Sequence, residues 1–342
     1  MIDWLSFTLP YSGPSVGDHY FRLDWESDAL LPAWNRHAKC EGSYSSAVLV
    51  HVIGGKMNVT GNPVKYLTGQ NVVGPDDAGL LVRLTVDAVR EKLNLPACVQ
   101  MRRAIENGDV NIRRADCTYH YHVGDEDDAR QWLRAMETAC HVRFRGRGHY
   151  DEGMASLLFG VSVKPGEKPK GSRYSTFKFY LKSEEIRKHP IRAPHWAMAE
   201  LNALCEGHIR AEALYRHPEL SEYNANWLHQ WTSTTAMRLH KAWVDKMEIS
   251  PQVELQTSQV KELPRWLRPT YLLWAAGEDV REVLSRPTFY RHRKSLMAHG
   301  IDIAVPGKER PKKVVPVLRV LEAKPACIER GPALFERLLA AA

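Results

Sequence analysis

Several features that are common in proteins are missing from this chain, and each absence excludes a class. No apolar run approaches the about 18 residues that a membrane-spanning helix needs. The six cysteines are scattered without a Cys-x-x-Cys pair, which indicates reduced core thiols rather than disulfides or a zinc knuckle. No Gly-Lys-Ser or Gly-Lys-Thr sequence marks a nucleotide-binding P-loop. Asp3 stands where a secretory signal would be basic and then apolar, so we expect a soluble, intracellular protein that does not enter a membrane.

Length and charge point to two domains and a polyanionic partner. The 342 residues suffice for roughly two domains at about 150 residues each. A hydrophobic content of 44%, with 10 Trp and 13 Tyr, excludes a disordered chain. The net charge of +7 is localised: Lys261 to Lys324 holds 14 basic and 7 acidic residues, whereas the rest of the chain holds 33 of each. Such a local surplus indicates a polyanion bound by the C-terminal part.

The spacing of apolar residues predicts an α+β fold. Strand-like alternation occurs at 2–9, 47–53, 56–60, 110–123, 176–181 and 209–214, and helical spacing occurs at 78–95, 125–140 and 194–205. We expect an antiparallel-rich sheet with helices on one face over residues 1–222. A helix and a Pro-bounded linker follow over 223–263. Residues 264–342 are predicted to form an all-helical domain with a basic tail.

Three of the predicted strands carry their polar residues on one parity. Alternate residues of a strand share a face, and in 110–123, 176–182 and 209–213 the opposite parity is apolar. If these strands are neighbours, one face of the sheet carries a set of ionisable and metal-competent side chains: Arg114, Asp116, Thr118, His120, His122, Lys178, Tyr180, Lys182, Arg210 and Glu212.

Such a face suits the transfer of a phosphodiester to a tyrosine. His120 and His122 would lie about 7 Å apart along the strand, close enough to bind one divalent ion. A tyrosine phenol has a pKa of about 10, so neighbouring cations such as Lys182 must favour the phenolate of Tyr180. An ion held by imidazole and carboxylate would polarise the phosphate, and the product would be a 5′-phosphotyrosyl link with a free 3′-OH.

Each of these features also has a plain structural interpretation. His-x-His in a strand is often two solvent-facing histidines, and a Tyr beside a Lys is often a surface pair. Arg-x-Glu on a strand is often a cross-strand ion pair. The matched parity on three separate strands favours the chemical interpretation.

Taken together, these residues resemble the gene II/X-type replication initiators of filamentous phages, which belong to the HUH endonuclease group. The resemblance implies an HUH-type sheet and a rolling-circle initiator that acts in the cytoplasm of a bacterial host. Such a protein nicks and rejoins one strand of a phage or plasmid origin. The matching stretches follow the family order over most of residues 1–220: MIDWLSFTLP at the start, KYLTGQNVVG at Lys65, IRRADCTYHYH at Ile112, TFKFYLK at Thr176 and IRAEALYR at Ile209.

The resemblance also implies roles for individual residues. Tyr180 matches the DNA-linked tyrosine, and Lys182 matches its accompanying lysine. Arg114 and Arg210 match the arginines of an Arg-x-Asp and an Arg-x-Glu pair. The implied cofactor is a divalent metal, Mg²⁺ or Mn²⁺, and its candidate ligands are Asp116, His120, His122 and Glu212.

Two departures from the coliphage pattern leave alternatives open. This chain has a full His-Tyr-His, which is similar to the general HUH motif, and it has Gln70 where those proteins have His. Gln70 and Asn71 are therefore candidates for contacts with metal or DNA. Tyr174 lies six residues before Tyr180 on the same parity and is a candidate second nucleophile.

A basic run surrounds the candidate nucleophile. Residues 142–188 hold 11 basic and 5 acidic residues with Tyr150 and Tyr174 among them, which suits a single strand held by phosphate contacts and base stacking. Arg173 and Lys178 are the candidate DNA contacts in this run. Gly166 to Ser172 is expected to be a solvated loop. Since the chain has no P-loop, strand separation would require a host helicase.

The basic C-terminal part is predicted to contain a helix-turn-helix. Ser285 can cap a second helix, Pro287 suits its first turn and Gly300 its end. A recognition helix at this place would enter the major groove of duplex origin DNA. A basic amphipathic helix with a solvated face is the alternative. The residues expected to face outward to DNA are Arg286, Thr288, Arg291, His292 and Lys294.

The preferred hypothesis is a metal-assisted nicking and joining enzyme with a separate duplex-binding domain. Two other classes remain. A metal-dependent hydrolase could use His120 and His122 on a small substrate, without a tyrosine. A replication regulator or repressor could bind DNA without cleaving it.

Overall fold

The computed structural model describes residues 1–24, 29–42, 46–142, 146–162, 169–249, 260, 263–298, 301–304, 325 and 331–342. Most of the predicted linker, the Lys-rich stretch after residue 305 and part of the 166–172 loop lie outside these ranges. Among the described helices, none is long and apolar enough to cross a membrane.

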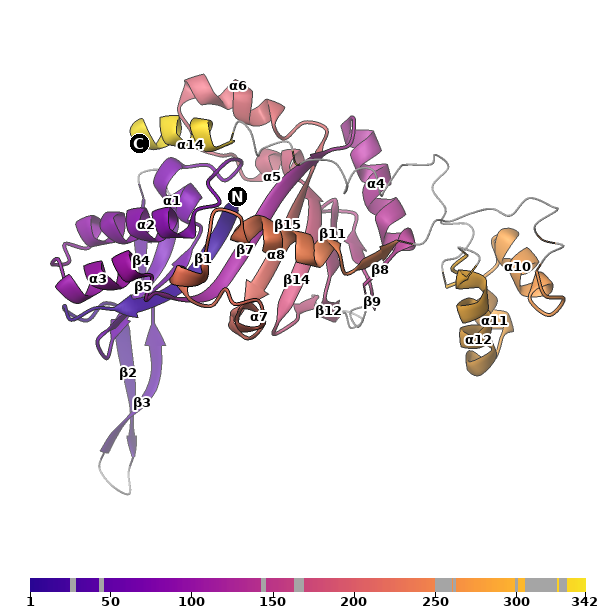
Figure 1. Cartoon of the computed structure of the whole chain (residues 1–342), viewed down its shortest axis with the longest axis horizontal. Helices are drawn as coiled ribbons and strands as arrows, with labels where there is room; N and C mark the ends of the chain where they lie inside the picture. The colour runs from indigo at the N-terminus through magenta and orange to yellow at the C-terminus, as the bar shows by residue number, and fades with distance from the viewer. Residues whose placement is uncertain are drawn as a thin grey trace.

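A nine-stranded antiparallel sheet forms the body of the protein (Figure 1). Every strand pairing within it is antiparallel, as the sequence predicted. Its strands, in spatial order, are β10 (His149–Asp151), β11 (Ser156–Phe159), β14 (Ser175–Leu181), β15 (His208–Arg216), β7 (Asn111–His122), β1 (Ile2–Pro10), β6 (Lys56–Gly61), β5 (Ala47–Ile53) and β4 (Ala38–Glu41).

Smaller elements flank this sheet. The hairpin β2 (Asp18–Asp24) and β3 (Ala29–Arg36) projects from one end of the body (Figure 1). Two short sheets contain β16 (Met247–Ile249) with β8 (Cys140–Val142) and β9 (Gly146–Arg147), and β12 (Val161–Ser162) with β13 (Lys170–Gly171). The helices of the body are α1 (Pro63–Thr68), α2 (Ala78–Lys92), α3 (Val99–Asn107), α4 (Glu126–Ala139), α5 (Lys182–Lys188), α6 (His195–Ala203), α7 (His217–Glu222), the 3₁₀ turn Leu228–Gln230 and α8 (Thr235–Val244).

Local capping explains where the two long helices begin. The side chain of Asp77 accepts a hydrogen bond from the Leu80 amide at the start of α2. Asp125 does the same for the Asp128 amide at the start of α4, where three further acidic residues follow. Carboxylates in the first turn favour the positive end of the helix dipole. The predicted helix at 125–140 is confirmed.

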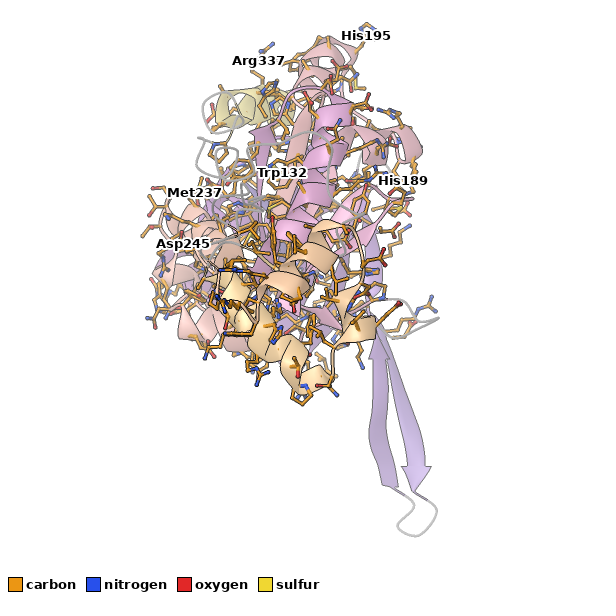
Figure 2. All side chains as sticks on the ribbon, turned by 90° about the vertical axis from the view of Figure 1, so that its right-hand side faces the viewer. Trp132, His189, His195, Met237, Asp245 and Arg337 are labelled. Atoms are coloured by element: carbon orange, nitrogen blue, oxygen red, sulfur yellow. The ribbon has the colours of Figure 1, made fainter. Side chains whose placement is uncertain are left out.

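The apolar face of the sheet is the main core. Phe177 and Phe179 of β14 pack against Trp132 of α4 and Trp243 of α8, with ring centroids 5.0 Å apart for Trp132 and Phe179. Trp132 lies near the middle of the body in Figure 2. Cys117 lies in the same core, and the five cysteines within the described residues are all free thiols, as predicted.

The first domain is longer than the predicted 1–222. Helix α8 buries Leu239 and Trp243 in the main core, and the Tyr215 hydroxyl donates to the Leu239 carbonyl over 2.8 Å. Strand β16 then pairs with β8. An amphipathic helix cannot remain in a linker when it can bury two large apolar side chains, so the domain continues to about residue 249.

The C-terminal part is divided between two bodies rather than forming one domain over 264–342. Helices α10 (Arg268–Ala275), α11 (Val280–Val283) and α12 (Arg286–Met297) share a small core of their own that contains Trp274, Phe289 and Leu296. Helix α14 (Gly331–Ala340) returns to the main body, where Phe335 joins the main core. Only α10–α12 and the residues packed with them form the separate helical module, residues 263–304.

His240 gives a testable pH dependence of stability. It is buried between the rings of Tyr119 and Phe177 and contacts the Tyr121 hydroxyl, and burial lowers the pKa of its imidazole to about 3. The stabilisation gained by burying the neutral ring is present above pH 6.5 and is lost as the pH falls towards 3. At pH 5 the loss is about 2 kcal/mol, because each unit is worth about 1.4 kcal/mol.

Urea unfolding at pH 7.5 and pH 5 tests this. His240→Gln, which does not titrate, should reduce the difference in unfolding free energy between the two pH values by about 2 kcal/mol. His195→Gln, at an exposed position on α6, is the control and should leave that difference unchanged. An unchanged difference for His240→Gln would contradict a buried neutral imidazole.

Candidate active site

Strand register brings the predicted polar residues onto one face of the sheet. In β14, β15 and β7, Tyr180 lies opposite Arg210, and Arg210 lies opposite His120. In the next row towards the other strand ends, Lys178, Glu212 and Thr118 face one another in the same way. The three strands that the sequence singled out are therefore adjacent, and their polar side chains share a face.

Tyr180 lies in the centre of this face with Glu212 as its partner. Its hydroxyl donates to Glu212 Oε2 over 3.4 Å, and Lys178 Nζ sits 4.3 Å from the centre of its ring. The side chain is 5% exposed, and burial raises the pKa of the phenol well above its ordinary value although Arg210 acts against this. Burial, with Asp3 nearby, also raises the pKa of Glu212. Tyr180 is thus a neutral phenol held against a carboxylate.

Lys182 does not activate Tyr180 by direct contact, in contrast to the sequence-based expectation. It is buried at the start of α5, where Nζ donates to Asn71 Oδ1 over 2.9 Å and to Glu185 Oε2 over 3.0 Å. Burial and the charge of Arg210 lower the pKa of the Lys182 ammonium. The lysine therefore fixes the loop that contains Asn71 to the end of β14.

Arg210 is also interior, so the prediction that it contacts DNA directly is wrong. It is fully buried, forms an ion pair of 2.8 Å with Asp3 and donates to the backbone carbonyl of Asn71. A cation in this position orders the groups around Tyr180 instead of binding a phosphate at the surface. Asp3 is a site residue that the sequence did not identify.

Gln70 is not available for metal or DNA. Its side chain is fully buried and bonds within its own loop: Nε2 donates to Thr68 and to the Val73 carbonyl, and Oε1 accepts from the amides of Val72 and Val73. All of its hydrogen-bonding capacity is used to hold the loop shape. Asn71 is 7% exposed and is occupied by Lys182 and Arg210.

The four candidate metal ligands do not lie together. Asp116 and His122 are six residues apart on one strand, about 20 Å, which is too far for one ion. Within the ranges that the structure describes, no three His, Cys, Asp or Glu side chains are grouped as a metal site. His122 is exposed and packs against the ring of His208, 5.0 Å away.

A hard cation fits the carboxylate side of this face better than the histidine side. Burial raises the pKa of Asp116 to about 7 despite its bidentate partner Arg114, and the negative charges of Glu212 and Asp3 raise it further. A divalent cation would relieve this repulsion. His120 is next to Arg210 and Lys182, whose charges, after burial itself, lower the pKa of its imidazole. Those two cations oppose metal binding there.

The face is open at the opposite end from Asn71. Trp4 is half-buried, the Arg114 guanidinium lies 4.8 Å from the centre of its ring, and its indole nitrogen donates to Ser6 and Thr60. Arg216 faces Arg114 across the strands. The predicted contacts Arg173 and Tyr174 are exposed, but six residues of strand, about 20 Å, separate Tyr174 from Tyr180. Tyr174 thus lies far from the Glu212 carboxylate.

Helix α12 has most of the predicted outward residues, with one exception. Arg286, Arg291 and Lys294 are exposed and Thr288 is half-exposed. His292 is buried: its Nδ1 contacts the Thr270 hydroxyl at 2.8 Å and its ring packs on Trp266. Positions 289, 292 and 296 share one helical stripe, so His292 faces inward with Phe289. A DNA-binding helix-turn-helix formed by α11 and α12 stays a prediction.

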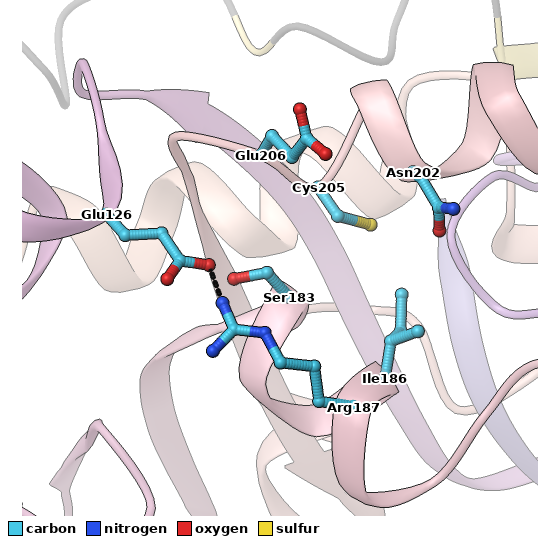
Figure 3. Close-up of a pocket in the computed structure, with 7 residues that line it drawn as sticks. All are labelled: Glu126, Ser183, Ile186, Arg187, Asn202, Cys205 and Glu206. Atoms are coloured by element: carbon cyan, nitrogen blue, oxygen red, sulfur yellow. Dashed lines mark hydrogen bonds and ion pairs between the residues drawn. The ribbon is translucent and has the colours of Figure 1, made fainter.

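A separate cavity of about 270 Å³ opens at the end of β14 away from Trp4 (Figure 3). An ion pair between Glu126 and Arg187 crosses it. Tyr180 is not among its lining residues, so this cavity is not the catalytic centre. The cavity is lined by Glu126, Ser183, Ile186, Arg187, Asn202, Cys205 and Glu206.

Comparison with known proteins identifies the class as a phage replication protein. Two family profiles match, the N-terminal family of the replication-associated gene II protein over residues 1–234 and its C-terminal family over 255–335. The replication-associated gene II protein of Enterobacteria phage I2-2 is 31% identical over 360 residues, covering 99% of this chain and 97% of the relative. No solved structure matches. The chain belongs to the phage gene II family of replication-associated proteins, which confirms the resemblance and makes DNA its partner.

The buried ion pair of Asp3 and Arg210 can be tested by stability. Asp3→Ala leaves a fully buried guanidinium without its carboxylate, so the free energy of unfolding should fall by about 3–5 kcal/mol in urea titrations. Glu41→Ala removes the exposed pair with Lys39 and should change stability little. The double variant Asp3→Leu with Arg210→Met should recover most of the loss. Equal effects of Asp3→Ala and Glu41→Ala would contradict this role.

Proposed function

We propose that this protein initiates rolling-circle replication by nicking and rejoining one strand of a phage origin through Tyr180. The observation that carries the proposal is the Tyr180 hydroxyl against Glu212 in the centre of the polar sheet face. In this mechanism the Tyr180 oxygen attacks the phosphorus and the bond to the 3′ oxygen breaks. The product is a 5′-phosphotyrosyl link, and the 3′ oxygen takes up a proton to become a free hydroxyl. Attack by that hydroxyl reverses the step and rejoins the strand.

Glu212 is the proposed proton acceptor. The phenol does not ionise unaided at neutral pH, because its pKa is raised in this site. The raised pKa of Glu212 makes that carboxylate a stronger base than an ordinary glutamate, and it already accepts the phenol hydrogen bond. Proton transfer during attack therefore needs no prior phenolate.

The proposed cofactor is Mg²⁺ or Mn²⁺, held by Asp116 and Glu212 with Asp3 beside them. Carboxylate oxygens are the ligands that these ions prefer. The bound ion would supply charge neutralisation at the phosphate. His120 and His122 remain less suited, since cations flank the first and the second is about 20 Å along the strand from Asp116.

The open half of the polar face is the proposed path of the single strand. Lys178, Arg114 and Arg216 supply cations, and the half-exposed Trp4 offers an aromatic surface for base stacking. This path begins at Tyr180 and runs away from Asn71, because the other end of the face is covered. Arg173 extends it at the exposed end.

Tyr180→Phe tests the nucleophile. The variant should form no covalent protein–DNA adduct with supercoiled origin DNA and metal, while its affinity for a single-stranded origin oligonucleotide stays unchanged, since only one oxygen is removed. Denaturing gels of labelled DNA detect the adduct. Tyr174→Phe is the matched control and should form the adduct at the normal level.

Other outcomes separate the competing functions. A persistent adduct in Tyr180→Phe would reject this tyrosine, and its loss in Tyr174→Phe instead would move the assignment. Metal-dependent turnover of small phosphoesters without an adduct would indicate a hydrolase. Specific duplex binding without nicking would indicate a regulator.

The helical module is the proposed duplex-binding part. Replacing the exposed Arg291 and Lys294 with Ala should weaken duplex origin binding and reduce the salt dependence of log K by about one for each phosphate that is no longer neutralised. Fluorescence anisotropy at several salt concentrations measures both quantities. Lys241→Ala, an exposed lysine on α8, is the charge-matched control, and an equal effect of this change would place duplex binding elsewhere.

A further inference from the structure

The last helix of the chain packs at the covered end of the catalytic face. Leu334 and Leu338 of α14 share a buried cluster with Ala197 and Leu201 of α6. The Arg337 guanidinium lies 4.5 Å from the centre of the Trp196 ring. Figures 1 and 2 show α14 beside α6 at the same end of the body. The helical module is therefore inserted, along the chain, between two parts of the catalytic body.

The same cluster covers the loop that holds the active-site cations. Val72 and Val73 are fully buried and pack with the residues of α6 and α14. The four hydrogen bonds of Gln70 tie these two valines to the rest of the loop. A displacement of Val72 or Val73 would thus move the whole loop rather than a single side chain.

Asn71 connects this loop to the catalytic strands. On its inner side it accepts hydrogen bonds from Lys182 and from Arg210, the residue opposite Tyr180 in the sheet. A continuous set of contacts therefore runs from Leu338 through Val72 and Val73 to Asn71, and from there to the row that contains Tyr180. Each contact in this set is buried, so it has little room to adapt.

We propose that α14 is a positioning element for strand cleavage and that it acts through Asn71. This inference rests on the proposed function of Tyr180. In this view the C-terminal helix holds the 69–73 loop in place, the loop sets Arg210 and Lys182, and these set the phenol relative to Glu212. Since the module lies between the body and α14 in the chain, strain on the module can reach the catalytic face through this helix.

Leu338→Asp in the full-length protein tests the proposal. It places a carboxylate in the buried cluster, and the rate of adduct formation on a saturating single-stranded origin oligonucleotide should fall by on the order of 100-fold, the effect of a small misplacement of reacting groups. Oligonucleotide affinity should stay unchanged, because α14 lies away from the proposed strand path. Ala340→Asp, an exposed position on the same helix, should keep the wild-type rate.

A double-mutant cycle shows whether the effect travels through Asn71. Asn71→Ala alone should slow adduct formation, and adding Leu338→Asp to it should slow the reaction little further. If the two effects multiply fully, α14 does not act through Asn71 and the proposal fails. Leu338→Ala replaces Leu338→Asp throughout if thermal melting shows that the aspartate variant is unfolded.

Failure of the two proposals can be told apart. Absence of any adduct in the wild-type protein would reject the proposed function itself. A normal wild-type adduct with an undiminished rate in Leu338→Asp would reject only the role of α14. Reduced oligonucleotide affinity with an unchanged rate at saturation would also overturn the positioning role, because it would make α14 part of the binding surface.

Discussion

The organisation of the catalytic face depends on the fully buried guanidinium of Arg210. A buried charge is tolerated only when it is paired and hydrogen-bonded, so its surroundings must supply partners. Asp3 at the first strand provides the carboxylate, and the carbonyl of Asn71 provides an acceptor. These requirements bring the N-terminal strand and the 69–73 loop onto the middle of the sheet. Tyr180 and His120 flank the same residue in the register.

The alternation of side chains made much of this site predictable. A strand has a strict period of two, so the parity of Tyr180, Glu212 and Asp116 fixed the face on which each would lie, and the antiparallel register then placed them together. The same rule predicted the apolar face with Phe177. Acidic capping likewise predicted the start of α4 at Asp125. These features are local, and local patterns can be recognised without knowing the fold.

The features that the sequence did not reveal depend on contacts between distant segments. Asp3 joins the site because a bulge between Ile2 and Trp4 interrupts the alternation of β1, and no parity rule anticipates a bulge. Gln70 has the composition of a ligand, yet its partners lie within its own loop. His292 looks like a solvent-facing basic residue until Thr270 is placed beside it. The return of α14 over the body follows from Phe335 and Leu338 finding space there, which no local pattern specifies.

The distribution of charge on the polar face explains why Tyr180 is held neutral in the free protein. Carboxylates gather on one side, where the pKa values of Asp116 and Glu212 are raised, and the cations Lys182 and Arg210 are buried on the other. Each side lacks a complement that the proposed reactants would bring: a divalent ion for the carboxylates and a phosphate for the cations near the phenol. Binding both would lower the electrostatic cost of transferring the phenol proton to Glu212. An attacking tyrosine that gains reactivity only with substrate and metal in place cannot modify itself or bystander molecules.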